Sequence, residues 1–195
     1  MTGSNRHPGH LSVHKAGQFF VHLGVRPTEE RPGRYAQWCL TREQLASIIG
    51  DWTRVRWWWC SVSRPSTEGK YHATAKARKS LPAPLARYLT HNSPLGRVLY
   101  HGVGRDDLGA KALRADVYDP HHPDPQVRVL PTGPYNEIHS HYTLNVVSGE
   151  VGYAILKHIH DLLSEGGRAI ISVRRDLLLP KGDVSGDPEA EFQLD

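Results

Sequence analysis

From Arg97 onward the chain alternates short apolar, β-branched runs with segments of helical periodicity, and this alternation is the feature that most constrains the fold. The expected strands cover residues 98–101, 117–118, 127–130, 135–141 and 168–173, and the expected helices cover 107–113 and 151–163. Strands that alternate with helices are typical of an α/β fold with a parallel sheet. We therefore expect a layered α/β core in this half of the chain.

The first half carries weaker patterns. Residues 18–25 and 55–62 are apolar and aromatic enough to predict strands, and residues 82–90 predict a short helix that begins with prolines. Thr41 and Gln44 have the spacing of a capping box, which predicts a helix that starts after Thr41 and ends near Gly50.

One junction in the second half has the composition of a ligand site. The strand 98–101 runs directly into Gly102-Val103-Gly104, where the backbone can approach a ligand closely before a helix N-terminus. The next strand ends at Asp119 and Pro120, where a carboxylate can accept hydrogen bonds from a ribose diol. The third glycine of the NAD fingerprint is missing, because Asp107 stands in its place. The junction favours a nucleoside-containing cofactor other than NAD.

Several short segments within residues 70–176 occur in the order and spacing of one known family. They are His72–Arg78, Leu81–Arg87, Gly102–Arg105, Tyr118–Pro120, Leu144–Val146 and Ser172–Asp176, together with Leu162-Leu163 and Gly166-Gly167 before the last strand. The chain resembles class I S-adenosylmethionine-dependent methyltransferases, and among them the DNA phosphorothioation-associated and phage methyltransferase group. The resemblance implies a Rossmann-like sheet, S-adenosylmethionine as cofactor and methyl transfer linked to DNA modification.

The resemblance also implies site residues. Those that would bind the cofactor are Tyr100, Gly102, Gly104, Asp119, Pro120 and Asn145, and the catalytic candidates are Tyr142, Asn145 and His141. The Asn/Asp-Pro-Pro-Tyr/Phe motif of amino-methyltransferases and the Pro-Cys pair of cytosine enzymes are both absent from the sequence. The acceptor atom is therefore left open.

The sequence departs from this group at three points. Tyr100 stands where the group has an aspartate, and Asp106 stands where it has a third glycine, although Asp106 or Asp107 could supply a carboxylate from the loop. Only 22 residues follow Val173, too few for the usual final helix and antiparallel strand pair. The sheet is then either truncated at the C-terminus or completed by strands such as 18–25 and 55–62.

These patterns divide the chain into four parts. We expect a disordered tail over 1–16, a basic Trp-rich α+β extension over 17–69, a methyltransferase-like core over 70–179 and an acidic tail over 180–195.

The charge is uneven along the chain. Residues 1–97 hold 15 Lys and Arg against 5 Asp and Glu, whereas residues 98–195 hold 9 against 15. A basic first half favours a polyanionic partner, and nucleic acid, DNA more than RNA, is the expected one. Base stacking on Trp58 is one use of the aromatic run, and burial in a core is the other. The residues expected to contact nucleic acid are Arg54, Arg56, Trp58, Arg64, Lys76, Arg78 and Lys79.

The sequence speaks against several other classes. The histidine pairs, such as His139 and His141, lack the four-ligand spacing of a structural zinc site, so no metal is expected. Cys39 and Cys60 are too few for a disulfide scaffold, and no apolar run approaches the roughly 20 residues of a membrane span. We expect a cytoplasmic protein without a signal peptide.

Two functions stay open at this point. The first is a methyltransferase that acts on nucleic acid or on a modification intermediate. The second is a catalytically inactive, methyltransferase-like module that binds nucleic acid, which the substitution at Tyr100 favours.

Overall fold

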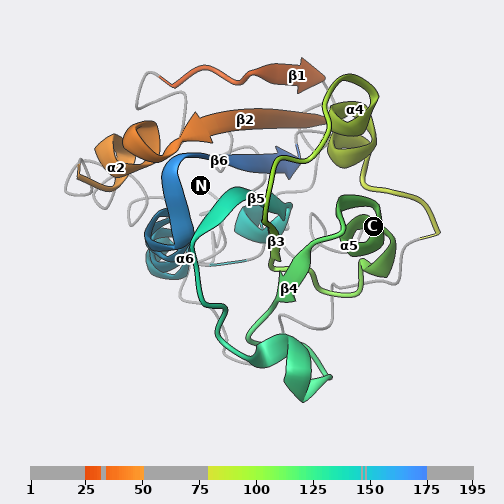
Figure 1. The fold of residues 1–195 in the computed structure, drawn as a ribbon. Coiled ribbons are helices and arrows are strands. Elements are labelled where there is room, and N and C mark those ends of the chain that lie inside the picture. Colours follow the sequence, from red (N-terminus) through yellow and green to blue (C-terminus); the bar gives the residue numbers. More distant parts are fainter. Residues whose placement is uncertain (1–24, 32–33, 51–78, 146, 148, 175–195) are drawn as a thin grey trace, which may run out of the picture.

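The computed structural model describes residues 25–31, 34–50, 79–145, 147 and 149–174, which form an α/β fold around one mixed sheet (Figure 1). The strands are β1 (Glu29–Arg31), β2 (Tyr35–Thr41), β3 (Val98–His101), β4 (Asp116–Tyr118), β5 (Tyr135–His141) and β6 (Leu163–Arg174). The helices are α2 (Arg42–Gly50), α4 (Ala83–His91), α5 (Asp107–Leu113) and α6 (Gly149–Leu162), with 3-10 turns η1 (Pro125–Arg128) and η2 (Thr143–Asn145).

The sheet has the order β1-β2-β6-β5-β3-β4. Strands β6, β5, β3 and β4 run parallel, whereas β2 pairs antiparallel with β6 and β1 pairs antiparallel with β2. Each parallel connection passes through a helix or a long loop, as parallel pairing requires. The predicted α/β class is confirmed, and the arrangement is compatible with a Rossmann-like fold.

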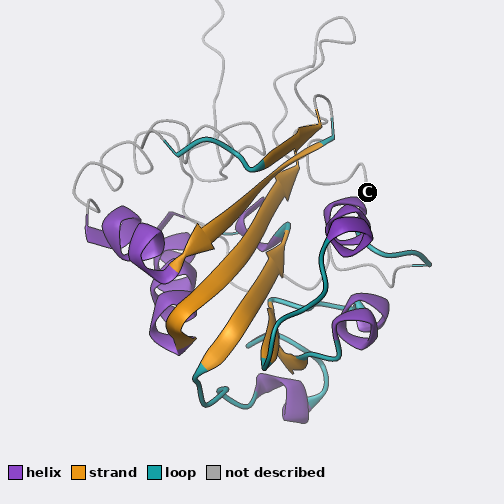
Figure 2. Cartoon of the chain, turned by 45° about the horizontal axis from the view of Figure 1, so that its top comes forward, coloured by secondary structure: helices purple, strands orange, loops and turns teal. Residues whose placement is uncertain are grey.

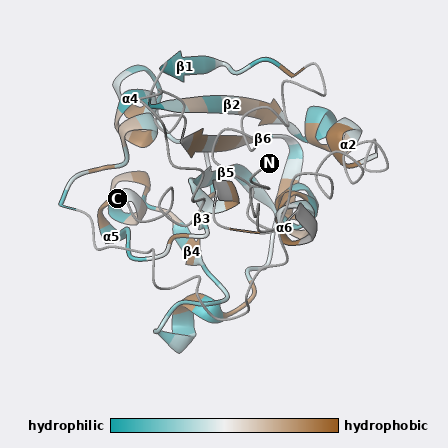
Figure 3. Cartoon of the chain, turned by 180° about the vertical axis from the view of Figure 1, so that it is seen from behind, coloured by the Kyte–Doolittle hydropathy of each residue, from teal (hydrophilic) through white to brown (hydrophobic). Residues whose placement is uncertain are grey.

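Helices cover both faces of this sheet (Figure 2). On one face, Leu45 of α2 and Ile159 of α6 pack in the larger apolar cluster with Ile138 and Ile171. On the other face, the smaller cluster joins α4, α5 and β3 through residues that include Leu85, Val98, Tyr100 and Leu113. Figure 3 shows hydrophobic stretches in β2 and β6 that hydrophilic residues interrupt, because alternate residues of each strand pack in the larger apolar cluster.

The strand and helix predictions for the second half were mostly confirmed. Strands 98–101 and 135–141 and helix 107–113 have the predicted bounds. The predicted strand 127–130 is wrong: Pro125 opens a 3-10 turn there, and the Asp124 side chain accepts a hydrogen bond from the backbone of Gln126 at 2.9 Å. These local bonds satisfy the backbone without a strand partner.

The last strand begins earlier than predicted. Helix α6 ends at Leu162 and β6 follows at once, so residues 163–167 are strand and not a loop. The register shifts between Tyr135 and Glu137, and Gly166 takes a φ of 71°. An irregularity of this kind lets a strand absorb a glycine-rich segment that sequence patterns assign to a turn.

The first half contributes the antiparallel edge of the sheet. Strand β2 was not predicted, and it pairs with β6 over its whole length, from Tyr35 opposite Arg174 to Thr41 opposite Arg168. The predicted extension and core therefore share one sheet. The strands predicted to complete it, 18–25 and 55–62, lie outside the described residues except for Val25, which belongs to no strand.

The capping box after β2 is confirmed. The Gln44 backbone N–H donates to Thr41 Oγ1 at 3.2 Å, and the Gln44 side chain accepts from the Thr41 N–H at 2.9 Å. Both bonds satisfy N–H groups that the start of α2 would otherwise leave unpaired.

Candidate functional site

The four parallel strands end at one edge of the sheet. Strand β3 is followed by Gly102, β4 by Asp119 and β5 by Tyr142. Because β3 has β4 on one side and β5 on the other, the strand order reverses between β3 and β5. Open α/β sheets bind ligands outside the carboxyl ends of their strands at such a reversal. This edge is the candidate site.

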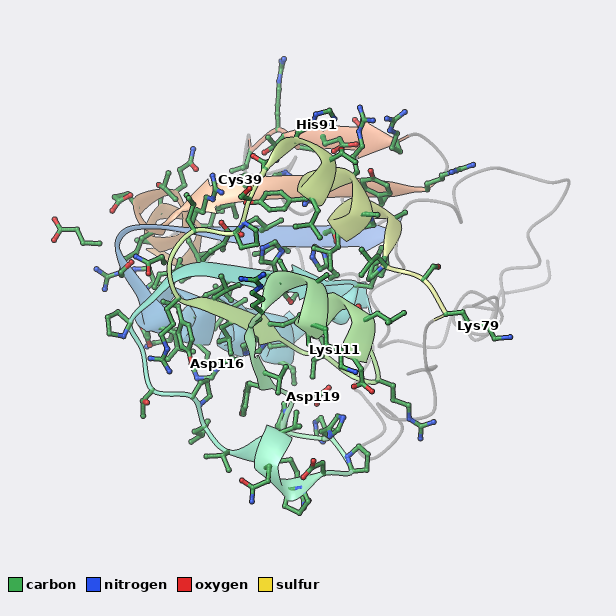
Figure 4. The ribbon with its side chains drawn as sticks, turned by 45° about the vertical axis from the view of Figure 1, so that its right-hand side comes forward. Cys39, Lys79, His91, Lys111, Asp116 and Asp119 are labelled. Atoms are coloured by element: carbon green, nitrogen blue, oxygen red, sulfur yellow. The ribbon has the colours of Figure 1, made fainter. Side chains whose placement is uncertain are left out.

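The glycine loop and Asp119 meet there. The Gly104 backbone N–H donates to Asp119 Oδ2 at 2.9 Å, and the His121 N–H donates to Oδ1 at 2.8 Å. Gly102 and Gly104 take φ values of 70° and 56°, which favour glycine. Asp119 is half-buried, and each of its oxygens can accept a further hydrogen bond. Figure 4 labels Asp119 beyond β4 and Asp116 at the start of the strand. Pro120, the next residue along the chain, is exposed.

The segment after β5 packs on the same loop. A Cβ added to Gly102 would lie 2.6 Å from Thr143 Cγ2, and Thr143 Oγ1 donates to the Gly102 carbonyl at 3.4 Å. Tyr142 takes a φ of 65°, and its N–H donates to the Ser172 carbonyl at 2.8 Å. Asn145 ends η2, and its side chain lies outside the described part of the structure. The predicted residues Gly102, Tyr142 and Asn145 therefore belong to adjoining segments of one edge.

Tyr100 is a buried residue, whereas a residue that binds the cofactor directly would be exposed at the strand ends. Its side chain is buried in the smaller apolar cluster, and its hydroxyl donates to Asp106 Oδ2 at 2.8 Å. Asp106 in turn accepts from the Gly109 N–H at 3.0 Å and caps α5. The two residues that depart from the family pattern are thus bonded to each other. Asp107, in the first turn of α5, stays exposed.

A second polar group lies on the same sheet face as Tyr100, and we term it the polar row: Glu137, His139, His141 and Ser172. Glu137 Oε1 lies 2.6 Å from His139 Nε2, and His139 Nδ1 lies 3.2 Å from His141 Nε2. His141 Nδ1 lies 2.7 Å from Ser172 Oγ, and the His141 ring contacts Tyr100 edge-on. All four residues are buried, and Glu137, His139 and Ser172 are completely so.

The negative charge of Glu137, at one end of the polar row, is balanced by hydrogen-bond donors. Glu137 Oε2 accepts from Arg168 Nη2 at 2.8 Å, from Arg168 Nε at 3.0 Å and from the Tyr88 hydroxyl at 3.0 Å. Burial raises the pKa of Glu137, but hydrogen bonds from His139, Arg168 and Tyr88 outweigh it and the pKa ends below its ordinary value. Burial lowers the pKa of His139 despite the neighbouring Glu137. A carboxylate beside a neutral histidine is the state that both directions favour.

An aromatic cluster lies on the opposite face. His101 Nε2 lies 3.1 Å from His158 Nδ1, and Tyr118 contacts both rings edge-on. Burial and the neighbouring His158 lower the pKa of His101 to about 3. This histidine is therefore neutral at physiological pH.

The expected nucleic-acid interface is almost entirely outside the described residues. Lys79, labelled in Figure 4, is exposed at the start of the described segment that leads into α4. Arg54, Arg56, Trp58, Arg64, Lys76 and Arg78 are not among the described residues. Of the tryptophans, Trp38 is a core residue of β2, with a relative exposure of 1%. Cys39, beside it, is half-buried, and burial raises the pKa of its thiol.

Sequence reasoning missed Glu137 and Thr143, and it considered His139 only as a metal ligand paired with His141, a possibility that the spacing spoke against. Glu137, His139 and His141 alternate along one strand, and alternate residues of a strand share a face. That spacing predicts a row of three side chains. No group of three or more metal-ligating side chains is found within the described residues.

The comparisons with known proteins add no relatives: no family model, no curated protein and no solved structure matches this chain. Over the described part of the chain, none of the helices combines the length and the apolar character needed to cross a membrane.

Proposed function

We propose that this protein is an S-adenosylmethionine-dependent methyltransferase that acts in nucleic-acid modification. The observation that carries the proposal is the hydrogen bond between the Gly104 N–H and Asp119 at the carboxyl edge of a parallel sheet. It brings the glycine loop and the acidic residue together outside the carboxyl ends of the strands, where open α/β sheets bind ligands.

The residues at this edge suit the nucleoside part of such a cofactor. Asp119 keeps lone pairs for the two ribose hydroxyls, while its bonds to Gly104 and His121 hold it in place. Gly102 leaves room for the segment at Thr143 to approach the loop, since a side chain there would collide with it. These groups would bind and orient the cofactor, which supplies an electrophilic methyl group when bound.

The antiparallel edge of the sheet also supports the methyltransferase assignment. In the methyltransferase group, an antiparallel pair follows the fifth strand at the C-terminal end of the chain. Here β2 lies antiparallel beside β6, and β1 beside β2, although both come from the first half. Strands β1 and β2 thus occupy the position of that C-terminal pair, which favours a completed sheet over a truncated one.

Calorimetric titration with S-adenosylhomocysteine tests the proposal. We expect micromolar binding by the full chain and a loss of at least about tenfold in affinity for Asp119→Ala, because both loop bonds and the ribose acceptors are removed. Asp116→Ala is the matched control, since Asp116 lies at the other end of β4 and bonds to Arg97 and Tyr135. Equal affinities in the wild type and Asp119→Ala would refute the assignment of this edge.

A second function is favoured by the Tyr100–Asp106 pair. The hydroxyl and carboxylate that could meet the charged methionine end of the cofactor are bonded to each other and buried. A module that binds nucleic acid without methyl transfer would keep the basic first half and lose the donor chemistry. Such a protein would bind DNA with strong salt dependence and show no heat of binding with S-adenosylhomocysteine.

A further inference from the structure

The polar row has a defined hydrogen-bond direction. Glu137 receives two N–H donors from Arg168 and is held as a carboxylate, which can only accept. His139 must therefore carry its proton on Nε2, which leaves Nδ1 to accept from His141 Nε2–H. His141 Nδ1 then carries no proton and accepts from the Ser172 hydroxyl at 2.7 Å. Every donor in the row points from Ser172 toward Glu137.

The Ser172 end of the row lies at the carboxyl edge of the sheet. Ser172 pairs with His141, the last residue of β5, and lies two positions before the end of β6. The opposite end, at Glu137 and Arg168, lies beneath α4 through Tyr88. The row therefore crosses the sheet toward the edge where the cofactor is proposed to bind.

An unused donor lies beside Ser172. Gln37 of β2 is directly opposite Ser172 in the antiparallel register, on the same face of the sheet. Its side chain is 4% exposed, and its amide nitrogen has no hydrogen-bond partner within the described residues. Buried amides are nearly always paired, so this one is positioned to donate to a group that the structure does not contain.

We propose that Ser172, His141, His139 and Glu137 form a proton relay that deprotonates the methyl acceptor, with the Gln37 amide donating to the acceptor beside Ser172. This inference rests on the proposed methyltransferase function. Ser172 and His141 would touch or accept from the substrate, whereas His139 and Glu137 are positioning residues.

The proton balance is simple. The acceptor nitrogen or oxygen forms a bond to the methyl group as the bond from that group to the sulfonium breaks, and the acceptor loses its proton to Ser172 Oγ. The Ser172 proton passes to His141 Nδ1, the His141 Nε2 proton to His139 Nδ1, and the His139 Nε2 proton to Glu137. Ser172, His141 and His139 each gain one proton and give one, and Glu137 keeps the proton that it receives from His139.

This relay selects a class of acceptor. A base is needed when the acceptor carries a proton, as an amine, amide N–H or hydroxyl does at neutral pH. A phosphorothioate sulfur is already anionic and needs none. The relay therefore predicts an N–H or O–H acceptor. Since Ser172 is completely buried, substrate binding must open the edge to admit it.

Other ionisable groups also face the row. Arg168 of β6 and Tyr88 of α4 contact Glu137, and Tyr100 of β3 contacts the His141 ring with Asp106 behind it. Cys39 of β2 interacts electrostatically with Glu137. Among them Arg168 is the cation and favours the Glu137 carboxylate, which in turn fixes the direction of the row.

The first test needs no substrate. Long-range ¹H–¹⁵N spectra of the full chain, assigned with His139→Asn and His141→Asn, report which ring nitrogen carries each proton. We expect both histidines to be neutral and protonated at Nε2 at pH 7. Protonation of His141 at Nδ1 would reverse the row and overturn the relay without touching cofactor binding at Asp119.

The second test uses methyl transfer from labelled S-adenosylmethionine to two DNA duplexes of the same mixed sequence, one ordinary and one with phosphorothioate linkages. For His141→Asn we expect unchanged cofactor affinity and a rate at least about 100-fold lower, the usual contribution of a general base. Glu137→Gln should lower the rate less and shift its pH dependence, because it acts through His139. His160→Asn is the matched control, because His160 is a half-buried residue of α6 that bonds to Asp161 and does not touch the polar row.

The outcomes separate the two proposals. Methylation confined to the phosphorothioate duplex and unaffected in His141→Asn would overturn the relay and leave the methyltransferase in place. Methylation of the ordinary duplex at an undiminished rate in His141→Asn would do the same. No methylation of either duplex, together with no cofactor binding, would overturn both.

Discussion

The two faces of the sheet are stabilised in different ways. The face beneath α2 and α6 is apolar and close-packed, with Ile138 and Ile171 completely buried. The face beneath α4 and α5 buries Glu137, His139 and Ser172 just as deeply, although these side chains are polar. Apolar packing tolerates small changes in shape, whereas a buried polar network is favourable only when every member is bonded. One face thus stabilises the fold through apolar packing, and the other does so through buried hydrogen bonds.

The largest expected effect comes from breaking the polar face. Glu137→Ala leaves His139 and Arg168 without their acceptor, and we expect a loss of about 3–5 kcal/mol in the free energy of unfolding. Ile138→Ala, the next residue on the opposite face, should cost about 2–4 kcal/mol through the cavity that it leaves. Urea denaturation measures both, and a larger loss for Ile138→Ala would remove the contrast between the faces.

The second expected effect is a dependence of the free energy of unfolding on pH. The pKa of His101 falls from 6.5 to about 3 on folding, so this histidine adds no pH dependence above pH 6.5 and destabilises the fold below it, where the unfolded chain takes up the proton. His139 acts in the same direction. Each histidine held neutral should contribute a loss of about 1.4 kcal/mol per pH unit well below pH 6.5.

Urea denaturation at intervals from pH 7 to pH 5 measures that slope. His101→Asn should remove the contribution of His101 to the slope and leave those of His139 and His158, whose pKa values burial also lowers. An unchanged slope in His101→Asn would show that folding does not lower the pKa of His101.

The smallest expected effect concerns neither face. Thr41→Ala removes one half of the capping box at the start of α2, and we expect a loss of about 1 kcal/mol in the free energy of unfolding. Thr41→Ser, which keeps the hydroxyl, should restore most of it. A loss in Thr41→Ala as large as that in Glu137→Ala would mean that α2 governs the stability of the whole sheet.

Local patterns predicted the parallel part of the fold well. Strands 98–101 and 135–141 are bounded by Gly102 and Tyr142, and such boundaries depend on neighbouring residues alone. The capping box at Thr41 was predictable for the same reason. The meeting of Gly104 with Asp119 was predictable because parallel strands end at a common edge.

What the sequence could not predict depends on pairing between distant residues. Strand β2 lacks a strict alternation because it is buried on both faces, and its partner β6 lies far along the chain. The Tyr100–Asp106 bond and the contact of His141 with Ser172 also join residues whose proximity only the folded chain creates. Sequence motifs include each of these residues, but they do not predict which residue it bonds to.

The pairing of β2 with β6 has a consequence for synthesis. Residues 35–41 pair with residues 168–174, so each strand position waits for a partner made 127 to 139 residues later. At about 5–20 residues per second, the ribosome releases β2 roughly 6 to 28 seconds before β6 exists. During that interval an apolar strand that includes Trp38 has no hydrogen-bonding partner on the β6 side. The nascent chain therefore presents an unpaired strand edge for several seconds, and such an edge can pair with another chain.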